Sequence, residues 1–379
     1  MQSHRKHILF LASWYPQRNS LDNGDFIQRH AQAVATLHDV TVVHAIKDPR
    51  LKTAKFEIEQ RSIQGVKEII VYVKPSLFRP FNFFYLLQGF LVGIQQVKSF
   101  DLIHLNVVFP AGIIALYLKS KFKVPVVLTE HWTHLHHNKF KELARYKQIT
   151  IRRILEHMDA IVPVSDHLGK SLQQIQPSIT YQVVPNVVDL NQFKLSSTKD
   201  FHITRFLHLS HLGDEHKNIS GMLRVAKKLV DHGYEFEFHM GGNGDLNPIL
   251  KFIQLHQLEN WIIPFGRLKH DEVNEKMSAA TCFVLFSRFE NQPCVQAESF
   301  ACGLPIIATD VGGIKEYLPE DYGILIESEN EDQLYQAMKQ VIEGHSFADA
   351  KEMNHYAKNH FSTPAIAQQF HQIYKQLFQ

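Results

Sequence analysis

The chain has 379 residues, longer than one hydrophobic core usually supports, so we expect two domains. Apolar residues make up 45% of the composition and charged residues 21%, which is typical of a soluble globular protein. No run of about twenty apolar residues without charge occurs, so the sequence predicts no membrane-spanning helix. The three cysteines contain no C-x2-C pair, which argues against a disulfide framework and favours reduced thiols in the cytoplasm.

Net charge is distributed unevenly along the chain. Residues 1–190 carry 23 Lys and Arg against 14 Asp and Glu, a balance of +9. The remaining residues carry 17 against 24, a balance of −7, and together the two balances give the +2 of the whole chain. Opposite signs predict different partners for the two domains. Because no recognition motif accompanies the positive charge, we expect no nucleic-acid partner.

Short apolar runs alternate with helical patterns in the first half. The basic residues 1–6 precede an apolar run that is too short for a signal peptide, and we expect this run to form the first strand. Apolar residues at helical spacing predict a helix over residues 25–37. Continuous apolar runs separated by helices indicate a parallel sheet covered on both faces. The predicted strands are residues 7–12, 40–45, 68–73, 102–105, 124–128, 160–164 and 182–184.

A polar stretch without clear periodicity, residues 191–204, marks the expected domain boundary. Strand-like runs then resume, which predicts an α/β protein with two doubly wound (Rossmann-like) parallel-sheet domains facing a cleft. In such sheets ligands bind at the carboxyl ends of the strands. A final helix over residues 366–378 carries Ile366, Phe370, Ile373, Tyr374 and Leu377 on one face. The predicted strands of the second half are residues 205–209, 236–240, 261–264, 281–286 and 304–308.

Two glutamates, Glu290 and Glu298, bracket the start of a predicted helix between two of these strands. Pro293 suits the first helical position, where its missing N–H costs nothing. The free N–H groups of Cys294 and Val295 would then point at the strand ends and bind a phosphate. Solvated glutamates on an amphipathic helix are the plainer interpretation. The strand–loop–helix–Gly–x–Pro–strand context favours instead a site for a nucleotide sugar, which needs carboxylates for its hydroxyls beside a phosphate site.

That stretch and its surroundings resemble the retaining GT-B glycosyltransferases of family four (glycosyl transferases group 1). The resemblance runs through nearly the whole chain in the family's order. It implies that residues 1–190 bind the acceptor, that residues 191–360 bind the donor, and that residues 361–379 form a helix crossing back to the N-terminal domain. The motifs that carry it are Trp14-Tyr-Pro16, Asn23-Gly24-Asp-Phe26, Asp101-Leu-Ile-His104, Thr129-Glu-His131, Val184-Pro-Asn186, Lys217-Asn218, Gly241-Gly-Asn-Gly244 and Val311-Gly-Gly-Ile-Lys-Glu316, together with the glutamate pair.

The resemblance assigns roles to the glutamate loop. It implies that Glu290 contacts the sugar hydroxyls and that Glu298 holds the ribose. Asn291 lies in the same loop and is expected to bind the donor as well. The set of motifs is specific to the family but not to one substrate, so neither the base nor the sugar of the donor is predicted.

A departure from the family concerns the diphosphate site. Lys217 matches the lysine that neutralises the departing diphosphate, but the family's arginine aligns with His211. A histidine is only partly protonated near neutral pH and cannot form a bidentate fork. Either Lys217 carries most of the charge, or another arginine, such as Arg288, substitutes for the missing one. Arg288 is alternatively expected to frame the nucleotide base.

Two residues of the first half complete the predicted site. His131 follows the strand at residues 124–128 and matches the histidine that, in the family, lies beside the transferred sugar. Gly24 would allow close backbone approach to the sugar phosphate or acceptor, although a simple turn before a helix explains it nearly as well.

His134, His136 and His137, which follow His131, suggest a metal cluster, but such a run within one loop is more typical of a surface segment. Since no Asp-x-Asp occurs, we expect no metal and no cofactor.

Two further segments have alternative interpretations. Gly241-Gly-Asn-Gly244 lacks the third glycine of a dinucleotide-binding fingerprint, so a tight turn is the better interpretation. An aromatic segment beginning at Lys74 and Arg79, with a second basic run at residues 139–153, is typical of an interfacial helix that meets acidic lipid headgroups. A core helix with its entry loop explains the aromatic residues equally well. The positive balance of this half favours the anionic membrane surface.

The resemblance, with the patterns above, implies a metal-independent, retaining glycosyltransferase that uses a nucleoside-diphosphate sugar. The acceptor would be a saccharide or a lipid-linked hydroxyl compound in polysaccharide or glycolipid biosynthesis. The expected location is the cytoplasm, with peripheral attachment at the inner face of the membrane as one form of it. Two alternatives remain: a nucleotide-sugar epimerase or phosphorylase on the same fold, and a non-catalytic nucleotide-sugar-binding protein, which His211 in place of arginine makes plausible.

Overall fold

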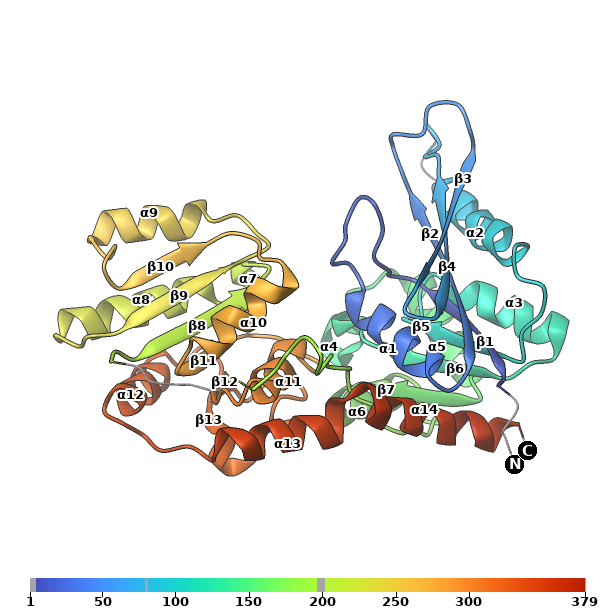
Figure 1. Ribbon diagram of the computed structural model, residues 1–379. Helices are drawn as coiled ribbons and strands as arrows, with labels where there is room; N and C mark the ends of the chain where they lie inside the picture. The colour runs from blue at the N-terminus through green and yellow to red at the C-terminus, as the bar shows by residue number, and fades with distance from the viewer. Residues whose placement is uncertain (1–4, 79–80, 196–201, 379) are drawn as a thin grey trace. The chain divides into compact units, whose positions relative to one another are not determined.

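The computed structural model of the chain (Figure 1) describes residues 5–78, 81–195 and 202–378. It divides into two compact units: unit 1 comprises Met1–Val187 and Thr363–Gln379, and unit 2 comprises Val188–Ser362. The sequence places these boundaries two or three residues away, at 190/191 and 360/361. Arg79, predicted to belong to the basic aromatic segment, lies outside the described residues.

Unit 1 is built around a seven-stranded sheet with the order β3-β4-β2-β1-β5-β6-β7 (Figure 1). Every neighbouring pair is parallel except β3 and β4. The inner strands are continuous apolar runs because both faces of the sheet are covered, and β5 is buried along its whole length. The strands are β1 (His7–Ala12), β2 (Asp39–Lys47), β3 (Phe56–Ile63), β4 (Val66–Val73), β5 (Leu102–Asn106), β6 (Val126–Glu130) and β7 (Ala160–Pro163).

Helices cover both faces of this sheet, which confirms the doubly wound arrangement. Side chains of α2, α3, α5 and α6 pack into the core on one face, and side chains of α1 and α14 pack into the core on the other. A short helix, α4, lies in the connection between β6 and β7. The helices are α1 (Asp25–Ala35), α2 (Phe81–Ile94), α3 (Gly112–Phe122), α4 (His137–Phe140), α5 (Arg145–Glu156), α6 (Asp166–Ile175) and α14 (Thr363–Leu377).

The edge strand β3 is a feature that the sequence does not predict. It is largely exposed and alternates charged with apolar residues, so no apolar run marks it. Gln64 and Gly65 join it to β4 with φ of 46° and 81°, the positive values that a two-residue hairpin turn requires. The prediction of a wholly parallel sheet is therefore wrong at this edge.

The strand predicted at residues 182–184 does not form. Backbone N–H groups of Gln182 and Val184 donate to the carbonyls of Ile161 and Pro163 at 3.0 and 3.2 Å, so the segment runs extended beside β7. Pro185 follows and has no N–H with which to continue the ladder. The segment is therefore an extended connection and not an eighth strand.

The last helix, α14, belongs to unit 1 and contacts α1. Ile366, Phe370, Ile373 and Tyr374, all on its predicted apolar face, are buried in the same core as α1. The hydroxyl of Tyr374 also lies 2.6 Å from Nδ1 of the buried His104 on β5. The helix is thus held by apolar burial and by a polar contact that reaches the centre of the sheet.

Unit 2 contains a six-stranded, wholly parallel sheet with the order β10-β9-β8-β11-β12-β13. The first strand of the unit, β8, lies in the middle, with β9 on one side and β11 on the other. The strand order therefore reverses beside β8, and open α/β sheets bind ligands at such a point. The strands are β8 (Arg205–Ser210), β9 (Glu237–Gly242), β10 (Ile262–Phe265), β11 (Cys282–Leu285), β12 (Ile306–Thr309) and β13 (Gly323–Ile326).

Helices also cover both faces of the second sheet. Side chains of α8, α9 and α12 pack into the core on one face, and side chains of α11 and α13 pack into the core on the other. Within the described ranges of both units, no helix is both long and apolar enough to cross a lipid bilayer. The helices are α7 (Asp214–Lys217), α8 (Ile219–Asp231), α9 (Asn247–His256), α10 (His270–Ser278), α11 (Cys294–Ala301), α12 (Glu331–Ile342) and α13 (Ala350–Phe361).

Candidate active site

Most of the predicted site residues lie in unit 2, in loops at the carboxyl ends of its parallel strands. The loop after β8 carries His211 and Lys217, and the loop after β11 carries Arg288, Glu290 and Asn291. Since β8 and β11 are neighbours, these two loops share one edge of the sheet. This edge is where the change in strand order predicts a ligand site.

An ion pair joins the two loops. Nζ of Lys217 contacts Oε1 of Glu290, and the two side chains are only 16% and 10% exposed. The hydroxyl of Ser287 donates to the same carboxylate oxygen at 2.8 Å. The structure therefore brings together two residues, 73 positions apart in the sequence, that were assigned to the diphosphate and to the sugar. A donor that has a diphosphate and a sugar would replace this ion pair, with its phosphate on Lys217 and its hydroxyls on Glu290.

Arg288 supports the loop after β8 that carries Lys217, which we call the lysine loop. Its guanidinium donates to the carbonyl of Asp214, to Oδ1 of Asn218 at 2.7 Å, and to Oε1 of Glu329 at 2.7 Å. These contacts fix both ends of the short helix that carries Lys217. To replace the family's arginine, or to frame a base, Arg288 would have to give up these bonds. The structure therefore places it as a residue that positions the lysine loop.

His211 keeps much of its surface open to solvent at the end of β8. The protein around its ring nevertheless removes part of its water, and this desolvation is the main cause that lowers its pKa. The positive charge of Lys217 and the ring of His216 lower the pKa further, while Glu290 acts in the opposite direction. His211 is therefore neutral at pH 7 and does not supply the charge of the arginine it stands for.

The start of α11 provides a further source of positive potential at this edge. The helix begins at Cys294, one residue later than predicted, and Pro293 is its N-cap with φ −71° and ψ 125°. Cys294 and Val295 are partly exposed, so their N–H groups lie where an anion can approach. Glu298, the residue predicted to hold the ribose, is on the second turn and only 5% exposed. It therefore lies deeper in the protein than Glu290.

The loop after β12 contacts the backbone of residues 287–291, the glutamate loop, and restrains it. The sequence does not reveal this role. Gly312 has φ +60°, and a Cβ there would lie 1.8 Å from the carbonyl oxygen of Glu290. The N–H of Gly313 donates to the carbonyl of Asn291 at 2.8 Å. The hydroxyl of Thr309 donates to the carbonyl of Ser287 at 2.7 Å. The Val311-Gly-Gly motif therefore fixes the path of the loop that carries Glu290.

The glycines at the end of β9 and just after it have a similar structural role. Gly242 has φ +135°, and a Cβ there would lie 1.9 Å from the carbonyl oxygen of Ser210. A Cβ on Gly244 would lie 2.2 Å from the carbonyl oxygen of His211. The segment therefore runs against the end of β8, which supports a tight turn rather than a dinucleotide-binding loop.

His131 lies in unit 1, directly after β6. Its ring packs 4.5 Å from that of Phe26 and 5.4 Å from that of His30, measured between centroids, and the residue is 8% exposed. Burial is the main cause that holds its pKa well below the usual value, so the imidazole is neutral at pH 7. A neutral imidazole can exchange hydrogen bonds with a sugar but cannot neutralise a phosphate.

Glu130, which precedes His131, is a functional candidate that the sequence does not single out. Its buried carboxylate accepts the backbone N–H groups of Val108, His131 and Trp132, each at 2.8 Å. Burial raises its pKa to about 7, although these three bonds act to lower it. The carboxylate ties the loop after β5 to the loop after β6 and so positions His131. An acidic residue at the end of a buried strand is the only sequence sign of this role.

Gly24 has a structural reason to be glycine. Its φ is +76°, and a Cβ there would lie 2.7–2.8 Å from the backbone of Trp14 and Tyr15. The glycine therefore lets the start of α1 pack against the loop after β1. This contact alone requires the residue, whether or not a donor or acceptor also approaches it.

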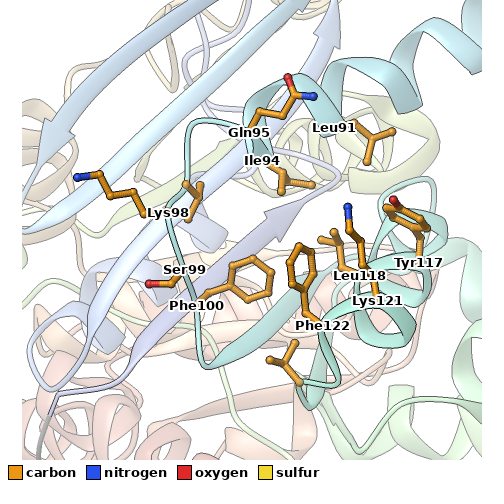
Figure 2. Close-up of a pocket in the computed structure, with 12 residues that line it drawn as sticks. Leu91, Ile94, Gln95, Lys98, Ser99, Phe100, Tyr117, Leu118, Lys121 and Phe122 are labelled. Atoms are coloured by element: carbon orange, nitrogen blue, oxygen red, sulfur yellow. The ribbon is translucent and has the colours of Figure 1, made fainter.

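A pocket of about 420 Å³ in unit 1 lies away from the loops at the carboxyl ends of that unit's strands (Figure 2). It is formed by the ends of α2 and α3 and by the chain that follows each of them, at the amino ends of β5 and β6. In the described part of the chain, no group of three or more His, Cys, Asp or Glu side chains is arranged to hold a metal ion.

Comparison with known proteins identifies the class. Residues 25–192 match the sequence model of Glycosyltransferase Family 4, and residues 203–360 match that of Glycosyl transferases group 1. Together with the two Rossmann-like sheets, these matches show that the chain belongs to the GT-B glycosyltransferases of the family-four, group 1 type. It is therefore an enzyme that transfers sugars.

Relatives with similar sequences include an uncharacterized glycosyltransferase of Methanocaldococcus jannaschii, which is 26% identical over 81% of this chain and 84% of that protein. Alpha-monoglucosyldiacylglycerol synthase of Streptococcus pneumoniae is 22% identical over 58% of this chain and 55% of that enzyme. N-acetyl-alpha-D-glucosaminyl L-malate synthase of Bacillus anthracis is 25% identical over 62% and 64%. The alignments with these two synthases thus span less than two thirds of the synthases' own length.

Solved structures confirm the fold. Sucrose-phosphate synthase of Thermosynechococcus elongatus superimposes with a TM-score of 0.79 at 18% identity, over 99% of both chains. HepE of Anabaena, solved in complex with UDP and glucose, superimposes with a TM-score of 0.76 at 15% identity, over 98% of this chain and all of that one. At these identities the likeness shows the fold alone.

Proposed function

We propose that the enzyme is a retaining glycosyltransferase that moves a sugar from a nucleoside-diphosphate sugar to a hydroxyl group, without a divalent metal. The acceptor is a membrane-held intermediate of glycolipid or polysaccharide synthesis, reached from the cytoplasm. The observation that carries the proposal is the ion pair of Lys217 and Glu290 beside the start of α11. A cation and a carboxylate that lie together in this way support a site for a diphosphate and for sugar hydroxyls.

Each part of this region has a role in the proposed reaction. Lys217 and the first N–H groups of α11 stabilise the charge that develops on the diphosphate, which is the largest contribution such a site can make. Glu290 orients the sugar through its hydroxyls. The acceptor oxygen attacks C1 on the face from which the diphosphate departs. As the bond between C1 and the acceptor oxygen forms, the bond between C1 and the diphosphate oxygen breaks. A phosphate oxygen takes the acceptor proton.

The relatives support this choice of donor and acceptor. HepE was solved with UDP-glucose as well as with UDP, so a protein with this fold accommodates a nucleoside-diphosphate sugar. The pneumococcal relative is named for the synthesis of a glycolipid. These relatives support the proposed substrate class, and the charged pair in unit 2 supports the proposed chemistry.

A donor panel tests the proposal. The protein is incubated with UDP-, GDP- and ADP-sugars, and slow release of the nucleoside diphosphate is measured with and without EDTA. We expect release from one donor class and no effect of EDTA. The anomer of the transferred sugar is then determined by NMR, and inversion at C1 would contradict the retaining mechanism.

The same assay separates the alternatives. An epimerase would convert the donor to another sugar nucleotide without an acceptor, and a phosphorylase would release a sugar phosphate in the presence of phosphate. A non-catalytic binding protein would bind the donor and leave it intact. The neutral His211 is the specific observation that favours this last alternative, because it leaves the site with one fewer cation.

A further inference from the structure

Unit 1 exposes large apolar side chains at one end of its α2–α3–α5 layer. Leu77 is fully exposed and Phe78 is 61% exposed, both just before α2. Exposed aromatic and aliphatic side chains rarely gather in this way on a surface that stays in water. We call the following set the apolar cap: Leu77, Phe78, Phe81, Phe84, Tyr146 and Ile149.

Contacts link the two helices that contribute to the cap. Phe83 of α2 stacks on Phe109, with ring centroids 5.5 Å apart and an angle of 10° between the planes. Nζ of Lys147 on α5 lies 5.6 Å from the centre of the same Phe109 ring. The starts of α2 and α5 therefore meet through Phe109, which places their exposed side chains on neighbouring parts of the surface of unit 1.

The cap is presented on a rigid support. The second half of α2 packs on β2 and β4, where Gly89 and Gly93 let the helix approach Val73 and Val43 of the sheet closely. The first half extends past the carboxyl end of β4 and remains exposed. The second half of the helix is therefore core, as one of the two interpretations of this segment expects, and the first half is surface.

The charges around the cap have one predominant sign. Helices α2 and α3 contain no Asp or Glu, and α5 carries Arg145, Lys147, Arg152 and Arg153 against the single acid Glu156. Apolar side chains interleaved with basic ones are what an anionic lipid surface attracts, because the apolar groups enter the headgroup layer while the cations meet its charge.

The position of the cap relates it to the acceptor. The starts of α2 and α5 follow β4 and β6, so the cap lies toward the carboxyl edge of the sheet. The same edge carries the loops with Gly24 and His131. Contact at the cap would therefore bring a lipid-linked hydroxyl to the edge where this unit holds its predicted acceptor site.

We propose that the apolar cap is a docking surface for an anionic bilayer, and that it delivers a membrane-held acceptor to the strand-end loops of unit 1. This inference rests on the proposed function for the identity of the acceptor. The contact with lipid itself stands on the cap, and it is tested without any substrate.

Sedimentation with vesicles tests the apolar part of the proposal. The full chain should sediment with vesicles of phosphatidylcholine mixed with phosphatidylglycerol, and much less with phosphatidylcholine alone. Phe81→Ser combined with Phe84→Ser should weaken this binding about tenfold or more, because two exposed rings no longer enter the lipid. Tyr117→Ser combined with Phe122→Ser is the matched control, since these exposed rings lie at the far pocket of Figure 2. Binding should change by less than about twofold in the control.

A second pair of variants tests the charge. Arg145→Gln combined with Lys147→Gln should weaken binding about tenfold or more, since each basic residue near an anionic surface contributes about 1 kcal/mol. Lys98→Gln combined with Lys121→Gln removes the same charge at the pocket of Figure 2 and should have a much smaller effect. Equal losses from both pairs would mean that overall charge, and not the cap, attracts the lipid.

Other outcomes would overturn the proposal. Wild-type protein that stays in the supernatant at low salt with anionic vesicles does not dock on lipid. Self-association that depends on Phe81 and Phe84, with no vesicle binding, would make the cap an interface between two copies. Circular dichroism and thermal unfolding of every variant show whether a loss of binding reflects a loss of fold.

The design also separates this inference from the proposed function. Lys217→Ala should bind vesicles as the wild type does, because the residue lies in unit 2 and outside the cap. Hydrolysis of a soluble donor should survive the cap variants. Failure of donor hydrolysis with intact vesicle binding would reject the glycosyltransferase mechanism and leave the docking surface standing.

Discussion

At the scale of single residues, the charged side chains of the site are already paired with one another, and its histidine is neutral. Lys217 and Glu290 neutralise each other when no donor is bound, and each is shielded from solvent. Arg288, the nearby arginine, is committed to the loop beneath the lysine. His211 is neutral at pH 7. Three substitutions in this group separate the functions of the sugar contact, the phosphate contact and the missing arginine.

Glu290→Gln tests the sugar contact. The amide keeps the shape but loses charge-assisted acceptance, worth roughly 1.5–3 kcal/mol for each bond to a hydroxyl. Turnover should therefore fall about tenfold or more. Affinity for the nucleoside diphosphate should not fall, because Lys217 loses its competing partner. Initial rates and calorimetric titration check both parts, and wild-type turnover would reject the assignment.

Lys217→Ala tests the phosphate contact. Affinity for the nucleoside diphosphate should fall by about tenfold or more, since a charge-assisted bond of roughly 1.5–3 kcal/mol is lost. Affinity for the free nucleoside should stay nearly constant, because it has no phosphate to neutralise. Titrations with the two ligands give the ratio directly. Equal losses for both would indicate that the substitution disturbs the loop and not the charge.

His211→Arg restores the residue of the family. A guanidinium stays charged at every pH of interest and offers a bidentate fork. Activity should be maintained or increased, and the gain should be larger at pH 7 and above, where the histidine contributes no charge, than in acid, where the histidine gains a proton. A pH profile of kcat/KM for both proteins measures this difference. A complete loss of activity would show that the imidazole itself takes part in the reaction.

At the scale of elements, glycines in the connecting loops determine how the site is assembled. The loops after β9 and β12 each approach a neighbouring backbone so closely that only glycine fits. Arg288 ties the loop after β11 to the loop after β8, and Ser287 donates to Glu290 within the same loop. The loop that carries Glu290 is therefore held by the loops after β8 and β12, which are distant from it in sequence.

Gly312→Ala tests this support. The new methyl group would lie 1.8 Å from the carbonyl of Glu290, and the residue would also have to keep a φ of +60°. We expect a loss of about 1–3 kcal/mol in the free energy of unfolding and a fall in turnover, because the glutamate loop must move. Gly266→Ala is the control: its φ lies outside the positive range, and a Cβ there meets nothing within 4 Å. Unfolding in urea and initial rates compare the two variants.

At the scale of the whole molecule, buried histidines in both units couple stability to pH. Burial lowers the pKa of His30, His44 and His208 from 6.5 to about 4. Between these values the unfolded chain binds protons that the folded chain does not, so stability falls as the pH decreases. Glu130 acts in the opposite sense, because burial raises its pKa from 4.5 to about 7. The three histidines change the free energy of unfolding by more than the one carboxyl does. Acid therefore destabilises the folded chain.

Urea unfolding between pH 4 and pH 8 measures this coupling. The free energy of unfolding should decrease from about pH 6.5 downward, by up to about 3 kcal/mol for each histidine. His208→Gln should reduce the slope by about one proton, since a neutral amide replaces a ring that lies 2.8 Å from the carbonyl of Val284 and from the hydroxyl of Ser210. An unchanged slope in the variant would show that His208 does not contribute.

The sequence predicts much of the fold because apolar periodicity is a local property. Buried parallel strands are continuous apolar runs, so residues 7–12 are predicted at the bounds that β1 has. The exposed strand β3 has no such run and is missed. Residues 182–184 have the run, but Pro185 has no N–H to continue the ladder beside β7, and they form no strand.

The sequence by itself determines the family, the two doubly wound units and the residue types of the site, because motifs and periodicity are written along the chain. Tertiary structure alone decides which of these residues meet. It pairs Lys217 with Glu290, ties Arg288 to the lysine loop, and aims the carboxylate of Glu130 at three backbone N–H groups. It also decides which half of α2 is core and which is surface. These outcomes depend on contacts between segments far apart in sequence, and no local pattern encodes their distances.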